Sequence, residues 1–340
     1  MGPQSEKNIQ VLLAQRPKGA PTDEDFKVVE SPMPAPGPGQ VLVQNLYLSL
    51  DPYMRGRMND AKSYIPPIEI GAVMGGGTVG RVIQSDVPEL PVGTIVEGLL
   101  GWQEFATAKP KALRVVDPGL APISTALGVL GMPGLTAYFG LLDLGKPVPG
   151  DTVVVSAASG AVGSLVGQLA KRMGCRTVGV VGTDEKAHYI VNTLGYDAAI
   201  NYRTAESLRH AIREAAPDGV NVYFDNVGGP VTDAVFLNLA QRARVVLCGQ
   251  ISLYNASKQE VGPRNLTQIL MTRSKIEGFI VFDYLEQYPK GLSDLSTWLA
   301  NGEITYKEDV VTGLENAPRA FMGLLEGKNF GKLVIKIAEE

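Results

Sequence analysis

Short apolar runs alternate with amphipathic stretches from about residue 125 to residue 282. The runs are rich in Val and Ile and have the length of buried strands, and the stretches between them have the length of helices. This alternation predicts a parallel sheet covered by helices. Strands are expected at Thr152–Ser156, Arg176–Val181, Ala198–Ile200, Val220–Asp225, Ala243–Cys248 and Lys275–Phe282. Helices are expected at Thr125–Leu142, Ala161–Met173, Asp184–Thr193, Ala205–Ala215 and Pro230–Leu239.

The first part of the chain, up to about residue 125, follows a different pattern. It is dense in Pro and Gly and contains short β-type runs such as Val41–Leu48 and Gly77–Ile83, which predict an irregular, barrel-like lobe. The tail Ile304–Glu340 carries an expected helix, Ala317–Glu326, and an expected strand, Lys332–Ile337. It is too short to fold alone, so we expect it to return to the first lobe.

These patterns predict an α/β protein with a doubly wound parallel sheet and a second, β-rich domain. The β-rich domain is expected to comprise residues 1–126 and 300–340, and the nucleotide-binding domain residues 127–299. With 340 residues, of which 45% are hydrophobic, the chain is long enough to bury the core of both.

The junction of the first buried strand and its helix has the features of a phosphate-binding turn. Val153–Val155 suit a parallel strand, and the small residues Ala157–Gly160 let backbone N–H groups approach a pyrophosphate at the start of a helix. Gly163 and Gly167 lie on one helix face, where they permit close packing on the strand. The spacing is looser than the usual three-glycine fingerprint, so a purely structural turn remains an alternative.

The end of the second buried strand favours NADP over NAD. A NAD-specific fold usually places a carboxylate there to bind the ribose hydroxyls, whereas this chain has Gly182 at the nearest equivalent position. Lys186, one helical turn later, could reach a 2′-phosphate, and the Tyr202 hydroxyl could contact the same group. In the alternative interpretation, Asp184 and Glu185 bind the ribose and Lys186 is a solvated helix residue.

Metal and triad chemistry are poorly supported by the residues. A zinc site needs three or four converging ligands, but the chain has only two histidines, His188 and His210, and two isolated cysteines, Cys175 and Cys248. Both histidines fall in expected helices among polar neighbours, which is typical of exposed positions. No Gly-x-Ser-x-Gly elbow follows a strand, so a hydrolase triad is not indicated. Among the reaction classes considered, hydride transfer without a metal remains.

Hydride transfer to a carbonyl compound needs a donor that stabilises negative charge on the oxygen, and tyrosine is the residue to look for. Tyr254 follows the strand that ends near Cys248, at the carboxyl end of the expected sheet, where ligands of open α/β folds bind. Tyr53 lies in the first lobe and is a second candidate. For both residues, a half-buried structural tyrosine is the alternative.

Charge and cysteine content narrow the class of partner. The formal net charge is −4 and no Lys/Arg block stands out, so neither nucleic acid nor an anionic membrane is expected as a partner. Two cysteines cannot make a disulfide framework, and the polar N-terminus lacks a secretory apolar core, so we expect a cytoplasmic protein. No apolar run approaches the ~20 residues that span a bilayer. A small-molecule substrate is therefore expected.

Five segments occur in the order found in a known family: DPYMRGRM, GMPGLTAYFGLLDLGKPVPGDTVVVSAASGAVGS, DNVGG, CGQISLYN and GKNFGKLV. The chain resembles the zinc-free medium-chain dehydrogenases/reductases of the leukotriene B4 12-hydroxydehydrogenase or prostaglandin reductase type, which include plant alkenal double-bond reductases and bacterial curcumin reductase. The resemblance covers essentially the whole chain. It implies a GroES-like catalytic lobe, a Rossmann lobe, NADPH as cofactor, and reduction of the carbon–carbon double bond of α,β-unsaturated aldehydes or ketones.

The resemblance also implies roles for individual residues. Lys186 and Tyr202 match the 2′-phosphate contacts, and Ser159 stands where many relatives have Ala. The pyrophosphate turn matches Gly160, Ala161, Val162 and Gly163. The other cofactor contacts it implies are Asn226, Cys248, Gly249, Ile251, Ser252, Tyr254, Phe279, Ile280, Val281 and Asn329. The loops Met58–Ile70 and Ala256–Asn265 are where we expect the substrate pocket to vary.

The sequence therefore predicts an NADPH-dependent alkenal or enone reductase in which Tyr254 and the nicotinamide ribose hydroxyl hold the enolate oxygen. Two alternatives remain: an NADPH:quinone oxidoreductase, and an idle NADPH-binding protein. A homodimer is also expected, because the apolar strand Ile276–Phe282 would lie at the edge of the sheet.

Overall fold

The computed structural model describes residues 7–258 and 260–340. Its contacts divide the chain into two compact units. The first unit comprises the residues up to Gly128, together with Glu308–Asn329 and Leu333–Glu340. The second unit comprises Val129–Lys307 and the three-residue segment Phe330–Lys332.

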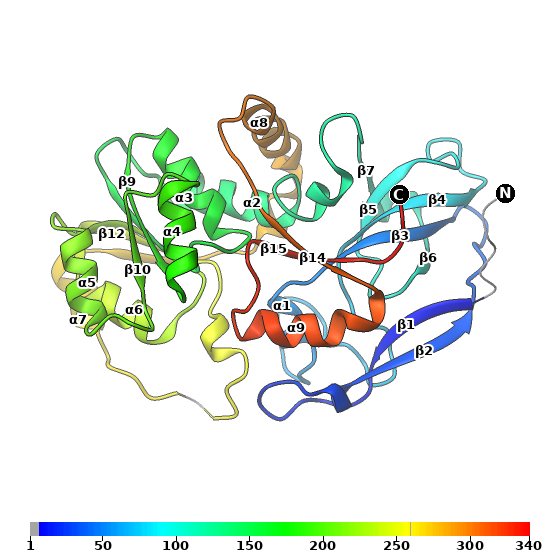
Figure 1. Cartoon of the computed structure of the whole chain (residues 1–340), viewed down its shortest axis with the longest axis horizontal. Coiled ribbons are helices and arrows are strands. Elements are labelled where there is room, and N and C mark those ends of the chain that lie inside the picture. The colour runs from blue at the N-terminus through cyan, green and yellow to red at the C-terminus, as the bar shows by residue number, and fades with distance from the viewer. Residues whose placement is uncertain (1–6, 259) are drawn as a thin grey trace. The chain divides into compact units, whose positions relative to one another are not determined.

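The second unit is built on a parallel sheet of six strands in the order β10-β9-β8-β11-β12-β13 (Figure 1). The strands are β8 (Thr152–Ser156), β9 (Arg176–Val181), β10 (Ala198–Asn201), β11 (Val220–Asp225), β12 (Leu239–Leu247) and β13 (Lys275–Gly278). The chain runs outward from β8 to β10 and then crosses back to β11. The strand order therefore reverses between β8 and β11, the place where open α/β sheets bind ligands.

Helices connect these strands and pack on them, with α3 against β8 and β9, α4 against β9 and β10, and α6 against β11. The helices of this unit are α2 (Met132–Phe139), α3 (Gly163–Arg172), α4 (Asp184–Asn192), α5 (Leu208–Ala215), α6 (Gly229–Phe236), α7 (Leu266–Thr272) and α8 (Tyr288–Ala300). Short 3-10 helices lie at Ile251–Leu253 and Val281–Gln287, and a π-helical turn at Gly140–Gly145.

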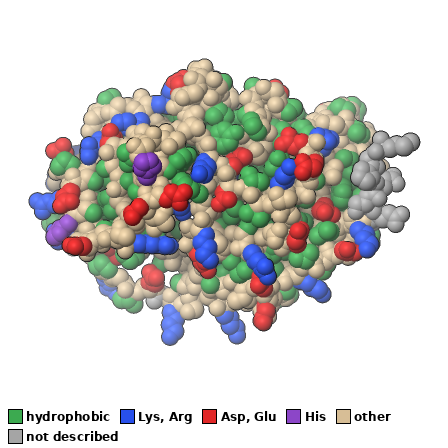
Figure 2. Space-filling view, in the orientation of Figure 1, with side chains coloured by type: hydrophobic (Ala, Val, Ile, Leu, Met, Phe, Trp, Pro, Cys, Tyr) green, Lys and Arg blue, Asp and Glu red, His purple; other side chains and the backbone are tan. Residues whose placement is uncertain are grey.

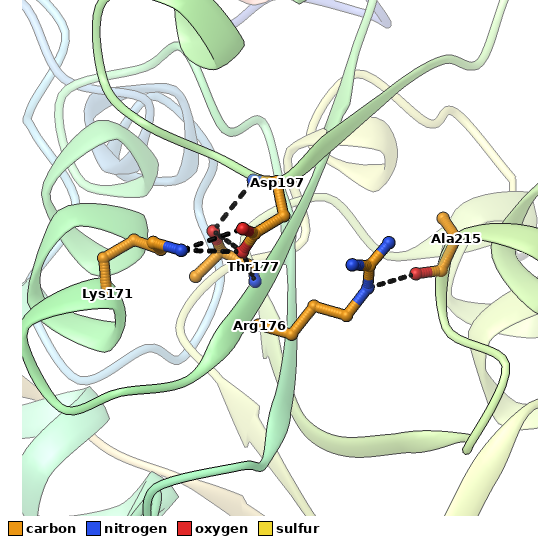
Figure 3. Close-up of polar contacts among 5 residues, drawn as sticks. All are labelled: Lys171, Arg176, Thr177, Asp197 and Ala215. Carbon is orange, nitrogen blue, oxygen red and sulfur yellow. Dashed lines mark hydrogen bonds and ion pairs between the residues drawn. The ribbon is translucent and has the colours of Figure 1, made fainter.

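Side-chain contacts tie the start of β9 to its neighbours, as Figure 3 shows. Asp197, just before β10, accepts hydrogen bonds from the Lys171 ammonium of α3 at 2.8 Å and from the backbone N–H of Thr177 at 2.7 Å. Arg176 donates from Nε to the carbonyl oxygen of Ala215 at the end of α5, at 2.8 Å. These contacts lie at the amino end of β9, so they stabilise the sheet at the edge opposite the ligand-binding edge.

Several expected elements differ from the observed ones in extent. The strand expected over Ala243–Cys248 begins four residues earlier, at Leu239, and two other elements differ further. The helix expected over Thr125–Leu142 is a 3-10 helix, Ile123–Leu127, followed after a break at Gly128 by α2 and its π-helical turn. The strand expected over Lys275–Phe282 ends at Gly278. The neighbouring strand β12 ends at Leu247, which pairs with Gly278. The residues after Gly278 therefore have no β12 residue to pair with.

The first unit contains a sheet of seven strands in the order β14-β15-β3-β4-β5-β7, with β6 also paired to β3, and a separate hairpin of β1 and β2. These strands are β1 (Lys7–Leu13), β2 (Phe26–Pro32), β3 (Val41–Ser49), β4 (Thr78–Ser85), β5 (Ile95–Gly98), β6 (Phe105–Ala108), β7 (Leu113–Val115), β14 (Glu308–Thr312) and β15 (Lys332–Lys336). Because β15 pairs with β3, the C-terminal tail completes this sheet.

The helices of the first unit are α1 (Tyr53–Arg57) and α9 (Ala317–Leu325), with short 3-10 helices at Asp23–Asp25, Pro110–Ala112 and Leu314–Asn316. Its core includes a ring cluster in which Trp102 stacks on Phe26 and meets Phe321 edge to face, with centroids 5.8 and 5.6 Å apart. The predicted fold class, a parallel α/β sheet with a second β-rich unit, is confirmed.

The surface shown in Figure 2 carries Lys and Arg beside Asp and Glu, with the two signs of charge interspersed. Within the described ranges, no helix has both the length and the apolar character needed to cross a bilayer.

Candidate functional site

The turn between β8 and α3 exposes backbone donors at the carboxyl end of the sheet. Gly160 donates its N–H back to the carbonyl oxygen of Ala157 at 2.9 Å, and Ala157 takes a left-handed conformation with φ of 50°. A Cβ on Gly163 would overlap that same carbonyl oxygen, so the turn requires glycine there. The backbone N–H groups of Ala161, Val162 and Gly163 have no acceptor among the residues that the structure describes. Such a group of free donors at a helix N-terminus fits an anion.

The second glycine of this helix has a different role from the one expected. A Cβ on Gly167 would overlap the ring of Tyr196, whose hydroxyl donates to the carbonyl oxygen of Gly163 at 2.6 Å. The expectation that Gly167 packs on the strand was therefore wrong. Its missing side chain admits the fully buried Tyr196, and Tyr196 in turn holds the first turn of α3 in place.

The segment Phe330–Lys332, which we call the strap, lies against the phosphate-binding turn. The N–H of Gly331 donates to the carbonyl oxygen of Ser159 at 3.2 Å, and Gly331 forms a parallel bridge with Gly160. The N–H of Lys332 donates to the carbonyl oxygen of Lys307 at 2.8 Å, which fixes the other end of the strap. Asn329, a predicted cofactor contact, directly precedes the strap in the sequence.

The predicted 2′-phosphate residues flank the carboxyl end of β9. Lys186 lies in the first turn of α4, where its N–H donates to the capping hydroxyl of Thr183 at 3.2 Å. The backbone N–H of Tyr202 donates to the end of β9, and its ring covers Gly182 so closely that a Cβ there would lie 3.2 Å from it. A side chain larger than hydrogen at Gly182 would therefore compete with the Tyr202 ring for space.

Asp184 and Arg203 also lie at the proposed 2′-phosphate site, near the carboxyl end of β9. Asp184 accepts a hydrogen bond from the Asn201 amide at 2.7 Å, so one oxygen of the carboxylate proposed in the alternative interpretation is already engaged. Arg203, for which the sequence indicated no role, donates from Nε to the Tyr202 hydroxyl at 3.3 Å. Its position directly after Tyr202 in the sequence could have indicated a second basic residue near the proposed 2′-phosphate site.

The ends of β8, β11 and β12 are joined by hydrogen bonds. Asn226, the first residue after β11, donates its N–H to the Ser156 hydroxyl and its side-chain amide to the Ser156 carbonyl oxygen, both at 2.8 Å. The N–H groups of Cys248 and Gly249 donate to the carbonyl oxygen of Asp225 at 2.9 and 3.0 Å. Three predicted cofactor contacts, Asn226, Cys248 and Gly249, are thus brought together where the strand order reverses.

Tyr254 lies on the segment that follows β12. Its ring is half-buried, and its hydroxyl accepts a hydrogen bond from the N–H of Gln250 at 3.4 Å. Burial raises the pKa of the Tyr254 phenol above its usual value, so the hydroxyl keeps its proton at neutral pH. Ser252 donates both its N–H and its hydroxyl to the carbonyl oxygen of Val227, at 3.0 and 2.6 Å, which ties this segment to the loop after β11.

Known proteins match both units of the chain. A family described as the N-terminal domain of oxidoreductase matches residues 9–116, and one described as zinc-binding dehydrogenase matches residues 161–298. The NADPH-dependent curcumin reductase of Escherichia coli is 45% identical over 99% of both chains, and the NADP⁺-dependent 2-alkenal reductase of Nicotiana tabacum is 41% identical over 98% of this chain. The chain belongs to the medium-chain dehydrogenase/reductase family. The predicted resemblance and the predicted enzyme class, an oxidoreductase, are confirmed.

A solved structure of this family agrees with the fold. The crystal structure of CurA from Vibrio vulnificus in complex with NADPH matches with a TM-score of 0.93 and 48% identity, over 98% of this chain and all of that one. The names of both relatives and of this complex include NADPH or NADP⁺, which is the predicted cofactor.

The remaining predicted residues of this medium-chain dehydrogenase/reductase lie farther along the sheet or in the other unit. Phe279 and Ile280 follow β13 at the edge of the sheet, and Val281 begins a 3-10 helix. The Phe279 ring lies against Gly140, where a Cβ would come within 2.7 Å of it. Tyr53 is the first residue of α1 in the first unit, where burial, followed by the charge of Asp51, raises the pKa of its phenol.

Both histidines occupy the positions expected from the sequence. His188 lies in α4 and His210 in α5, and both side chains are exposed. Although one of the matching family descriptions names zinc, no group of three or more His, Cys, Asp or Glu side chains is placed to hold a metal ion within residues 7–258 and 260–340.

Proposed function

We propose that this protein is an NADPH-dependent reductase of the carbon–carbon double bond of α,β-unsaturated ketones or aldehydes. The observation that carries the proposal is the placement of the Tyr254 hydroxyl, an oxyanion donor, just beyond the carboxyl end of β12 in a segment hydrogen-bonded to the loop after β11. The relatives support the reaction class, because their names include a curcumin reductase and a 2-alkenal reductase that use NADPH or NADP⁺.

The residues of the second unit fit NADPH. The free N–H groups of Ala161, Val162 and Gly163 suit the pyrophosphate, and the Lys186 ammonium and the Tyr202 hydroxyl suit the 2′-phosphate. Gly182 leaves no carboxylate to repel that phosphate. The contacts proposed for the nicotinamide end are Asn226, Cys248, Gly249, Ile251, Ser252, Phe279, Ile280 and Val281, with Asn329 beside the strap.

When bound, NADPH supplies a hydride, which the β-carbon of the substrate accepts. As that bond forms, the π electrons of the conjugated system move onto the carbonyl oxygen, and the Tyr254 hydroxyl donates a hydrogen bond to the resulting enolate. Such a donor stabilises charge that develops only in the transition state, so it accelerates the reaction rather than merely binding substrate. A proton from water then adds to the α-carbon, and the carbonyl group is restored.

The experiment that tests this function is NADPH consumption across a panel of alkenals, enones, curcumin-like diketones and quinones. We expect the enones and alkenals to be consumed fastest, and mass spectrometry to show products that gain two hydrogens and keep the carbonyl group. Cofactor deuterated at the transferred position should place the label on the β-carbon. Turnover of quinones alone would favour the quinone oxidoreductase, and tight NADPH binding without turnover of any substrate would favour an idle binding protein.

We also propose that the protein forms a homodimer through the β13 edge of the second unit. β13 has a strand on one side only, and α7, which packs on the neighbouring β12, exposes Leu266, Leu270 and Met271. β13 itself carries Lys275 and Glu277, so the apolar surface offered to a second copy comes from α7, beside a strand edge that is unpaired. Sedimentation at micromolar concentration should show a particle of twice 36.2 kDa, and a monomer alone would contradict the proposal. The cytoplasmic location stays a prediction from the cysteine content.

A further inference from the structure

A buried carboxylate lies at the end of β11, next to segments proposed to contact the nicotinamide. Asp225, the last residue of β11, is fully buried. Its carboxylate accepts five hydrogen bonds: at Oδ1 from the Ser156 hydroxyl (3.1 Å), the Tyr223 hydroxyl (2.9 Å), the Val227 N–H (3.0 Å) and the Gly228 N–H (2.9 Å), and at Oδ2 from the Thr232 hydroxyl (2.7 Å).

The negative charge of Asp225 is hydrogen-bonded but not neutralised. Its five partners are hydroxyl and amide dipoles, and no Lys, Arg or His in the described ranges forms an ion pair with it. Burying a carboxylate without a counter-ion is costly, even when its lone pairs are satisfied. An apolar residue here would leave the five donors without an acceptor, whereas an uncharged acceptor such as asparagine could take several of these hydrogen bonds without the cost of a buried charge. The hydrogen bonds therefore do not by themselves require a negative charge.

The charge of Asp225 reaches the segments proposed to contact the nicotinamide. Burial and then the Asp225 carboxylate raise the pKa of the Cys248 thiol to about 12. The same charge adds to the effect of burial on the pKa of the Tyr254 phenol. Asp225 also holds these segments in place, since its carbonyl oxygen accepts the N–H groups of Cys248 and Gly249 and its carboxylate fixes the loop that begins at Asn226.

We propose that Asp225 is a positioning residue whose buried negative charge stabilises the oxidised cofactor relative to the reduced one, so that NADPH becomes a stronger hydride donor when bound. The inference rests on the proposed function. Loss of a hydride converts the neutral dihydronicotinamide ring into a cation, and a fixed negative charge in a low-dielectric environment favours the cation. The hydride goes to the β-carbon of the substrate, and the charge that Asp225 stabilises is the one left on the ring.

The test replaces Asp225 with Asn and measures the dissociation constants of NADP⁺ and NADPH separately by calorimetry. Asparagine fits the site, because its oxygen can accept from the Val227 and Gly228 N–H groups while its amide donates to the Thr232 hydroxyl. We expect Asp225→Asn to weaken NADP⁺ binding about tenfold more than NADPH binding, which corresponds to a rise of about 30 mV in the potential of the bound couple. A variant with an unchanged ratio would overturn the proposal.

Tyr223→Phe is the matched control, because it removes one donor to Asp225 and keeps the charge. A purely structural role predicts that both variants weaken the two cofactors equally, whereas the proposal predicts that only Asp225→Asn changes their ratio. If Asp225→Asn does not fold, Asp225→Ser is measured in its place. The proposal also requires wild type to bind NADP⁺ at least as tightly as NADPH, so a wild-type preference for NADPH would overturn it whichever variants fold.

The same measurements separate this inference from the proposed function. Wild type that binds neither cofactor would contradict the proposed function itself. Wild type that binds NADPH and reduces enones, with the same NADP⁺ to NADPH ratio in Asp225→Asn, would leave that function standing and remove only the role of Asp225.

Discussion

The phosphate-binding turn and the Tyr254 segment are built in different ways, although both lie at the carboxyl end of the same sheet. The turn presents backbone N–H groups, and its shape depends on Gly163 and on the left-handed Ala157, all within one stretch of chain. The Tyr254 segment presents a side chain, and its position depends on hydrogen bonds that it donates to carbonyl oxygens of the loop after β11. The turn is therefore shaped mainly by its own backbone, whereas the Tyr254 segment is anchored to the loop after β11 by tertiary hydrogen bonds.

This difference explains how each region is expected to respond to substitution. In the turn, the donors are backbone atoms, so a substitution acts on them only by changing the shape of the chain. In the Tyr254 segment, one oxygen atom carries the proposed chemistry, so its removal should affect the reaction and leave the fold intact. The predictions below test this division.

The largest effect is expected for Tyr254→Phe, which removes the hydroxyl and keeps the ring. Loss of one oxyanion donor typically lowers turnover by about 10²-fold or more. NADPH affinity and the melting temperature should stay close to those of wild type. Steady-state kinetics on an enone whose rate shows a deuterium isotope effect are the measurement.

Tyr47→Phe is the matched control, because the Tyr47 hydroxyl donates to Glu340 in the first unit, at 3.0 Å. This control should turn over enones at the wild-type rate. Wild-type turnover in Tyr254→Phe as well would remove Tyr254 from the mechanism and make Tyr53 the next residue to test.

The next largest effect is expected for Lys186→Ala. Removal of a charge-assisted contact with the 2′-phosphate should cost roughly 1.5–3 kcal/mol of NADPH binding, which is about a 10- to 150-fold weaker affinity. NADH, which lacks this phosphate, should bind as before. Lys171→Ala is the control in the same unit, since Lys171 pairs with Asp197 at the opposite edge of the sheet. Equal weakening of both cofactors by Lys186→Ala would contradict the assignment.

A smaller effect, on stability rather than on catalysis, is expected for Gly167→Ala. The added methyl group would overlap the Tyr196 ring, and overpacking of this kind costs typically about 1–3 kcal/mol of unfolding free energy. Chemical denaturation measures the loss. Gly56→Ala is the control, because open space surrounds that position. A Gly167→Ala protein as stable as wild type would show that Tyr196 does not brace the first turn of α3.

The smallest effect is expected from pH. Burial raises the pKa of the Tyr254 phenol above that of an ordinary tyrosine. The hydroxyl therefore keeps its proton up to the pH at which an ordinary tyrosine ionises, and it stops donating a hydrogen bond only above the raised pKa. Enone turnover at saturating NADPH should therefore stay constant between about pH 7 and about pH 9. A rate that falls steadily over this range would indicate a different proton donor.

The local features of the second unit could be predicted from the sequence. The strands β8, β9 and β11 have the bounds that their apolar runs indicated, because a strand buried on both faces leaves a continuous hydrophobic signal. The helix expected over Thr125–Leu142 failed at Gly128, where the backbone leaves the helical region although the surrounding residues stay apolar. Apolar character alone did not show that break.

The contacts of the site between residues far apart in the chain could not be predicted from the sequence. Asp225 looks like an ordinary strand-ending aspartate, and only the register of β11 against β8 places it beside Ser156. In the same way, the sequence suited Gly167 to contact a strand, but the Tyr196 ring, from the segment between α4 and β10, lies against it. Contacts between distant segments leave no local periodicity to detect.

The strap has a consequence for how this protein can be divided. Because Phe330–Lys332 belongs to the second unit while the residues on either side belong to the first, the dinucleotide-binding unit is not one continuous piece of chain. A gene fragment that encodes only residues 129–307 would leave the Ser159 carbonyl without its bond to Gly331. Recombination that exchanged the C-terminal tail with that of a relative would also exchange the strap that bonds to the phosphate-binding turn.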